Sequence, residues 1–116
     1  PDAAIQAIRA MPGPTVLIAG GYDKHSEYDE WIEAFGDKVK YLVLIGQTRD
    51  KIAEGARSHG FTDIMYAEDM SEAVRVCASY ANMGDNVLLS PACASWGMFK
   101  NYEERGRIFK ECVRSL

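Results

Sequence analysis

Apolar residues gather along this chain in four short runs, each of which ends at turn-forming residues. Within each run the apolar residues are largely consecutive, whereas a strand with one solvent-facing side alternates apolar and polar positions. Consecutive apolar positions are typical of strands that are covered on both faces. We therefore predict four buried strands, at residues 15–19, 40–45, 62–66 and 86–89.

Helical patterns lie before, between and after these runs. The chain opens with a predicted helix at Ala3–Met11, which Pro12–Pro14 stops because proline does not continue a helix. The most regular pattern has apolar residues at i, i+3, i+4 and i+7 from Tyr28 to Phe35. Ser26 is its predicted N-cap, and Gly36 closes its far end.

Three further helices complete the pattern. One follows Thr48 and ends at Gly60, one follows Ser71 and ends near Gly84, and the last covers residues 102–116. Each has an apolar stripe that we expect to face the core. The stripes consist of Ile52, Ala53 and Ala56, then of Ala73, Val74, Cys77, Ala78 and Ala81, and finally of Ile108, Phe109, Cys112, Val113 and Leu116.

Strands and helices thus alternate with short connections, and such alternation favours a parallel sheet with helices on both faces. We predict an α/β fold, a Rossmann-like three-layer sandwich with a mainly parallel sheet. The chain has 116 residues, of which 47% are hydrophobic and 26% charged, as is typical of one globular domain. No repeat or linker divides it, so we expect a single domain over residues 1–116.

Charge and cysteine content exclude several functional classes. The net charge is −4 and no basic stripe is present, so nucleic-acid binding is not expected. The apolar runs are much shorter than the roughly 20 residues that a membrane-spanning helix needs. The three cysteines contain no CxxC pair, which argues against a disulfide framework or a zinc site. A reducing cytoplasm is the expected location.

Two segments at the expected carboxyl edge of the sheet carry the candidate chemistry, because ligands of open parallel sheets bind beyond the carboxyl ends of the strands. Gly20–Ser26 opens with paired glycines and contains the cation Lys24, and Ser90–Tyr102 is rich in hydroxyl and aromatic residues. Neither segment has the GxGxxG or Gly-Lys-Ser/Thr signature of a phosphate cradle. A cation, hydroxyls and backbone N–H groups near helix starts favour an anionic ligand.

Each candidate also has a purely structural interpretation. The Gly20–Gly21 pair forms either a tight strand exit or a close approach to a ligand. A lone lysine such as Lys24 is more often a solvated surface charge than a ligand contact. Ser95 is either a turn residue or a ligand contact, and Trp96 and Tyr102 lie either on the core or over a ligand.

The remaining reactive side chains are interpreted as structural. Cys93 has no general base beside it in the sequence, so we interpret it as a buried packing residue and not as a nucleophile. His25 and His59 are interpreted as surface residues without an acid or base role. We therefore predict no catalytic residue and no metal ligand in this chain.

The second segment resembles a known family. Ser90-Pro-Ala-Cys-Ala-Ser95, followed by Phe99-Lys-Asn-Tyr-Glu-Glu-Arg-Gly106, closely resembles the signature of the C-terminal domain of Mur ligases that add D-glutamate. Gly20–Gly21 with the nearby Lys24 resembles the other binding loop of these ligases. Residues 1–11 resemble the helix that opens their C-terminal domain, so the resemblance covers essentially the whole chain.

The resemblance implies an ATP-dependent ligase of peptidoglycan synthesis, which joins D-glutamate to UDP-N-acetylmuramoyl-L-alanine through an acyl phosphate. This chain would be its D-glutamate-binding C-terminal domain, with the N-terminal domain and the central domain for ATP and Mg²⁺ absent. By motif position, Lys24 pairs with a D-glutamate carboxylate, Ser95 hydrogen-bonds to it, and Trp96 and Tyr102 line the pocket. The isolated domain is expected to be an inactive monomer that binds no cofactor.

Two alternatives stay open at this point. Besides a D-glutamate-binding domain, the chain fits the corresponding domain of another Mur-type ligase or a non-catalytic, Rossmann-like binding module. The proposed site also makes a structural prediction, because Lys24 and Ser95 follow the first and the fourth predicted strands. Those two strands should be neighbours at a switch point of the sheet, which would place both segments at one crevice.

Overall fold

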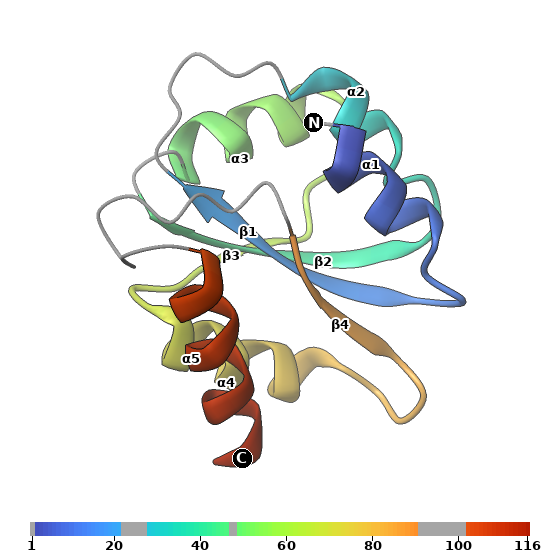
Figure 1. Ribbon diagram of the computed structural model, residues 1–116. Helices are drawn as coiled ribbons and strands as arrows, with labels where there is room; N and C mark the ends of the chain where they lie inside the picture. Colours follow the sequence, from blue (N-terminus) through green and yellow to red (C-terminus); the bar gives the residue numbers. More distant parts are fainter. Residues whose placement is uncertain (1, 22–27, 47–48, 91–101) are drawn as a thin grey trace.

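A computed structural model of the chain describes the backbone at residues 2–21, 28–46, 49–90 and 102–116. Within these ranges strands and helices alternate, as predicted (Figure 1). The strands are β1 (Thr15–Gly21), β2 (Val39–Gly46), β3 (Ile64–Tyr66) and β4 (Asn86–Leu89). The helices are α1 (Asp2–Arg9), α2 (Asp29–Glu33), α3 (Arg49–Ser58), α4 (Met70–Tyr80) and α5 (Tyr102–Arg114).

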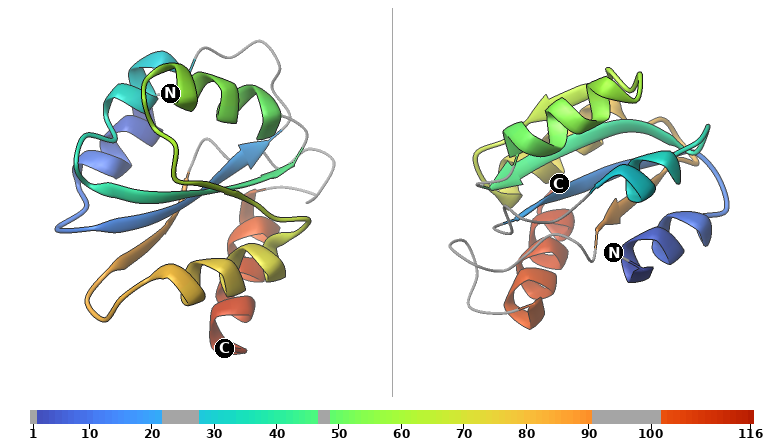
Figure 2. Two further views of the ribbon diagram at one scale, coloured as in Figure 1. Left: turned by 180° about the vertical axis from the view of Figure 1, so that it is seen from behind. Right: turned by 90° about the horizontal axis from the view of Figure 1, so that it is seen from above.

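The four strands form one parallel sheet in the order β3-β2-β1-β4. Since β2 lies on one side of β1 and β4 on the other, the direction in which strands are added reverses between β1 and β4. Helices α1, α2 and α3 cover one face of the sheet, and α4 and α5 cover the other (Figures 1 and 2). The predicted Rossmann-like three-layer sandwich is confirmed.

The unbroken apolar run of β1 contributes to a separate core on each face. Leu17 and Ala19 belong to the core beneath α1, α2 and α3, and Val16 and Ile18 belong to the core beneath α4 and α5. All four side chains are at most 1% exposed. Burying one such aliphatic side chain contributes about 1.5–3 kcal/mol, so a central strand gains from apolar residues at every position.

Strand β2 departs from regular alternation at its start. Thr15 pairs with Val39 whereas Val16 pairs with Tyr41, so Lys40 is an extra residue without a partner on β1. Val39 therefore lies in the same core as Leu42, although residues three apart on a regular strand face opposite sides. Such a bulge bends the strand and changes the direction of a side chain.

Two helices begin at residues other than those predicted. In α2 the N-cap is Tyr28, whose side chain makes no capping hydrogen bond, so the prediction of Ser26 as the cap of this helix is wrong. In α4 the N-cap is Asp69, whose carboxylate accepts a 2.8 Å hydrogen bond from the Glu72 N–H. Ser71 is consequently inside α4, because the aspartate two residues earlier satisfies one of the unpaired N–H groups of the first turn.

The apolar face of α5 is narrower than predicted. Ile108, Phe109 and Cys112 pack against the core shared with α4. Val113 and Leu116 are 43% and 65% exposed, so the prediction that these two side chains face the core is wrong. Val113 lies at the margin of the stripe, and Leu116 follows the end of the helix. Two other boundaries move as well, since β3 covers 64–66 instead of 62–66 and α1 covers 2–9 instead of 3–11.

Candidate functional site

The carboxyl ends of β1 and β4 meet at one edge of the sheet. The two strands are parallel neighbours with Ile18 opposite Leu89, and the Ser90 N–H donates a 2.8 Å hydrogen bond to the Ile18 carbonyl. The predicted adjacency of the first and fourth strands at a switch point is thereby confirmed. The chain continues from this edge into segments 22–27 and 91–101.

The four predicted binding residues belong to these segments or border them. Lys24, Ser95 and Trp96 lie outside the described residues. Tyr102 is the first residue of α5, and its side chain is not among those described. The structure therefore brings together the strands that precede the predicted site, and the contacts of the four side chains stay a prediction.

Gly20 is required by the packing of the sheet. Its φ of +142° is one that side-chain-bearing residues rarely adopt, and a Cβ built there would lie 1.7 Å from the Ile45 carbonyl oxygen. The neighbouring strand β2 thus leaves no space for any side chain at this position. The structure supports the interpretation of Gly20 as a strand exit, in which the close approach is to the backbone of β2.

An aromatic cluster lies under the start of α2, directly after segment 22–27. The Trp31 ring lies 6.0 Å from the Tyr28 ring and 4.9 Å from the Phe35 ring, and Phe61 packs edge-on against Phe35. Trp31 is 3% exposed, and its indole N–H has no hydrogen-bond partner among the described residues. Sequence patterns predicted the burial of Trp31 and gave no sign of its unpaired N–H.

His59 has a role that its sequence position did not indicate. Its Nε2 lies 2.8 Å from Oδ1 of Asp29, and the two side chains are 28% and 62% exposed. The contact joins the residue that follows α3 to the first residue of α2. His59 is an exposed residue, as predicted, and its contact with Asp29 links two helices.

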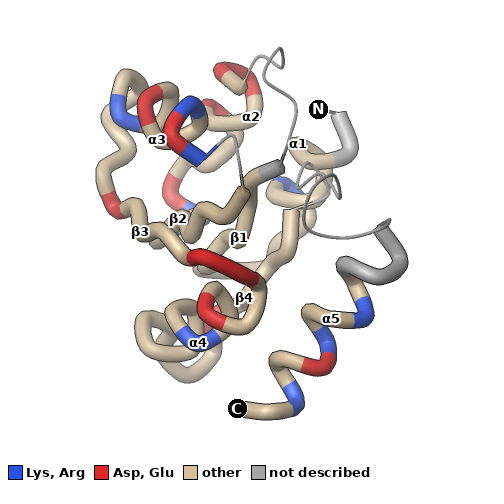
Figure 3. The backbone as a smooth tube through the Cα atoms, turned by 90° about the vertical axis from the view of Figure 1, so that its left-hand side faces the viewer, with Lys and Arg blue, Asp and Glu red and all other residues tan. Residues whose placement is uncertain are grey.

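In the part of the chain that the structure describes, no group of three or more His, Cys, Asp or Glu residues could hold a metal ion. A pocket of about 420 Å³ opens between α1 and α2 and is lined by Ile5, Gln6, Arg9, Glu30, Glu33 and Ala34. Acidic and basic residues are interspersed on α3 and on the described part of α5, whereas α2 has acidic residues alone (Figure 3). None of the described helices is long and apolar enough to span a membrane.

The described cysteines fit a structural role. Cys77 is buried in the core beneath α4, and this burial raises the pKa of its thiol to about 12. A thiol with so high a pKa is almost entirely protonated near neutral pH, so it is a poor nucleophile. Cys112 is partly buried on α5 and is likewise not in a disulfide. Cys93 lies outside the described residues.

Comparison with known sequences identifies relatives for most of the chain. A family model described as "Mur ligase, glutamate ligase domain" matches residues 1–93. A UDP-N-acetylmuramoylalanine--D-glutamate ligase of Lachnoclostridium phytofermentans is 62% identical over 116 residues, and one of Lachnospira eligens is 61% identical over 116 residues. A Thermoanaerobacter sp. ligase of the same name is 58% identical over 118 residues. Each alignment covers 100% of this chain and 26% of the relative, so the chain spans about a quarter of their length.

Proposed function

Because this chain belongs to the Mur ligase family, through its glutamate ligase domain, we propose that it binds D-glutamate for a ligase that joins this amino acid to UDP-N-acetylmuramoyl-L-alanine. The family resemblance predicted from residues 90–106 is confirmed. Since the chain is a quarter as long as its relatives, we assign it the part of a C-terminal domain over residues 1–116. The ligase activity belongs to a full-length enzyme that carries it.

The adjacency of β1 and β4 is the observation that supports this proposal. Their carboxyl ends lie together at the point where the strand order reverses. Open parallel sheets bind ligands at such points, because two loops diverge there and leave a crevice between them. The two segments that leave this edge are those with the Mur ligase signature and with Lys24.

Within this site we assign the roles by charge and hydrogen-bonding capacity. D-Glutamate has two carboxylates, and Lys24 pairs with one of them while the Ser95 hydroxyl donates a hydrogen bond. Trp96 and Tyr102 line the pocket. One charge-assisted hydrogen bond contributes about 1.5–3 kcal/mol, so a few of them suffice for a metabolite that is bound with micromolar to millimolar affinity.

ATP and Mg²⁺ do not fit the side chains described in this chain. No group there has the donors for a metal ion, and no segment has a phosphate-cradle motif. We therefore place ATP and Mg²⁺ in other domains of the full-length ligase. We expect the isolated domain to be a monomer without ATPase or ligase activity, and we place the ligase in the cytoplasm, where ATP is available.

An amino-acid selectivity assay tests the proposal. A full-length ligase that carries this domain is assayed with D-glutamate, L-glutamate and other D-amino acids at fixed concentrations of ATP and nucleotide sugar. We expect product with D-glutamate and much less with the other amino acids. Preference for a different amino acid would indicate another Mur-type ligase, and no product with any of them would favour a non-catalytic binding module.

The isolated 116-residue chain provides the matched control. It retains both proposed binding segments, so D-glutamate should perturb its NMR spectrum. The chain should not hydrolyse ATP. Measurable ATP turnover by the purified chain would overturn the assignment of ATP to other domains.

A further inference from the structure

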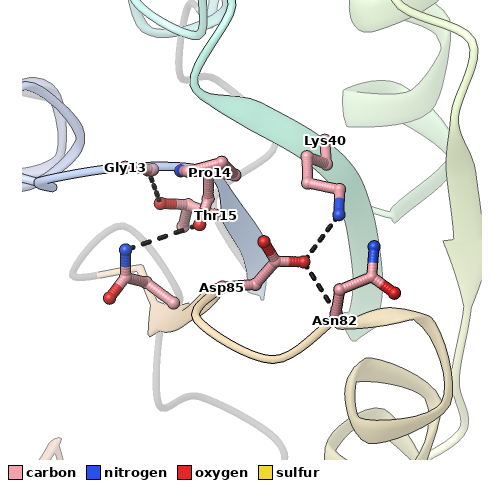
Figure 4. A network of polar contacts seen from close by, with 7 residues as sticks. Gly13, Pro14, Thr15, Lys40, Asn82 and Asp85 are labelled. Carbon is pink, nitrogen blue, oxygen red and sulfur yellow. Dashed lines mark hydrogen bonds and ion pairs between the residues drawn. The ribbon is translucent and has the colours of Figure 1, made fainter.

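An ion pair between Lys40 and Asp85 lies at the amino edge of the sheet (Figure 4). Nζ of Lys40 lies 2.6 Å from Oδ2 of Asp85, and the two side chains are 27% and 8% exposed. The same carboxylate oxygen accepts a 2.7 Å hydrogen bond from the Asn82 N–H. The hydrogen bonds from Lys40 and Asn82 lower the pKa of Asp85. Asp85 is thus held as an anion directly before β4.

The ion pair joins two strands that are not neighbours. Lys40 belongs to β2 and Asp85 precedes β4, while β1 lies between these strands. Lys40 is also the extra residue of the bulge in β2. A residue that a bulge frees from regular pairing can direct its side chain where the alternation of the strand would not. The bulge therefore accounts for the reach of Lys40 past β1 to Asp85.

Strand β4 lies at an edge of the sheet and has four residues. Among the described strands it pairs with β1 alone, and its Val87 is 37% exposed, while Leu88 and Leu89 pack against the two cores. The N–H groups of Asn86 and Ser90 donate to the carbonyls of Pro14 and Ile18, each at 2.8 Å. Short edge strands open locally at a lower free energy than the central strands of the same sheet.

We propose that Asp85 is a positioning residue for the D-glutamate site: paired with Lys40, it holds β4 on β1 and so positions the motif at residues 90–102, which follows β4. The inference rests on the proposed function. Loss of the ion pair loosens β4, from which the chain continues into the motif, while β1, β2 and β3 stay together. Binding of D-glutamate weakens without global unfolding, because the rest of the core does not depend on this pair.

Amide hydrogen exchange of the 116-residue chain tests the structural half of the proposal. In Asp85→Asn and in Lys40→Gln, the amides of Asn86 and Ser90 should exchange about tenfold faster, as expected for local opening. The amides of Leu42 and Ala67, which bond to Asp63 and Leu44, are the reference for the rest of the sheet and should stay better protected than those of Asn86 and Ser90 in both variants. Equal protection of all four amides in the variants, or unfolding of both variants, would show that β4 does not open on its own and would overturn the proposal.

Kinetics of the full-length ligase that carries the domain test the functional half. Both variants should raise the KM for D-glutamate about five- to tenfold while the KM for ATP and kcat change less than about twofold. Lys40→Arg keeps the cation and should restore the KM. Lys38→Gln is the matched control, because Nζ of Lys38 makes an equally short 2.6 Å contact with the Arg9 carbonyl, away from β4.

The outcomes separate the two proposals. If the unsubstituted ligase uses D-glutamate and the KM is the same in all variants, the positioning role is wrong and the proposed function stands. A KM raised as much by Lys38→Gln as by Lys40→Gln would also contradict the positioning role. If the unsubstituted ligase does not use D-glutamate, the proposed function fails and the role of Asp85 fails with it.

Discussion

At the amino edge of the sheet, hydrogen bonds and an ion pair hold the short turns in place. The Thr15 hydroxyl donates to the Gly13 carbonyl at 3.0 Å, the Asn86 N–H donates to Pro14, and Lys40 pairs with Asp85. At the carboxyl edge the chain leaves β1 and β4 for the two longer segments with the family signature. The described contacts at the amino edge hold the starts of the strands together, and we propose that the segments beyond the carboxyl edge bind the ligand. Substitutions at the two edges should therefore change stability and binding in different proportions.

Gly20→Ala should have the largest effect, because a side chain at this position would clash with the backbone of β2. The new Cβ would lie 1.7 Å from the Ile45 carbonyl oxygen, at a φ of +142°. A backbone clash combined with strain at a special φ should cost about 3 kcal/mol or more of the free energy of unfolding. Urea denaturation of the purified chain measures it.

Gly106→Ala is the control for that substitution. Gly106 is inside α5, and a Cβ there would meet nothing within 4 Å. Replacing a helical glycine by alanine should raise the free energy of unfolding by about 0.5–1 kcal/mol. Equal stability of the two alanine variants would show that β2 does not exclude a side chain at Gly20.

Lys24→Ala should affect binding and leave stability nearly unchanged, as expected of a residue on the functional edge. Loss of one charge-assisted contact should raise the KM for D-glutamate about 10- to 100-fold, with the KM for ATP nearly constant. Steady-state kinetics of the full-length ligase measure both constants. Lys110→Ala, on the exposed side of α5, is the control. A D-glutamate KM within twofold of the parent value would remove Lys24 from the site.

Acid should selectively weaken the amino edge. The pKa of Asp85 is lowered in the folded state, so its contribution to stability is present above the unfolded pKa of about 3.9 and is lost as the pH falls through the folded pKa. The free energies of unfolding of the parent chain and of Asp85→Asn should differ at neutral pH and converge below about pH 4. Urea denaturation between neutral and acidic pH tests this. A difference that does not change with pH would mean that the charge of Asp85 contributes nothing.

Cys93→Ala should have the smallest effect on catalysis, although Cys93 lies within the signature. We interpret its thiol as a packing group, so the melting temperature should fall by a few degrees and kcat should change less than about tenfold. Thermal denaturation and turnover of the full-length variant check the two quantities together. A loss of turnover beyond a hundredfold at an unchanged melting temperature would show that Cys93 takes part in the chemistry.

Local periodicity predicted most of the fold. The apolar runs at 15–19, 40–45 and 86–89 are strands, and the helix from residue 49 buries its expected stripe. The stripes of the helices from residues 70 and 102 are buried in part, because Ala78, Val113 and Leu116 are exposed. Helix starts were less predictable because several polar residues near a start can cap it, as Asp69 does instead of a cap at Ser71. Of the candidate site, the sequence predicted the two segments and their common edge. The contacts of Lys24 and Ser95 stay a prediction.

The sequence by itself determined the α/β class, the faces of most helices and the family, because periodicity and motifs are properties of neighbouring residues. The tertiary structure decided which strands meet, where β2 bulges and what each polar group contacts. Lys40 and Asp85 are 45 residues apart, and only the strand order and the bulge bring them within 2.6 Å. The burial of the Trp31 indole N–H without a hydrogen-bond partner among the described residues depends on packing in the same sense. Such contacts depend on segments that are distant along the chain, so no local pattern encodes them.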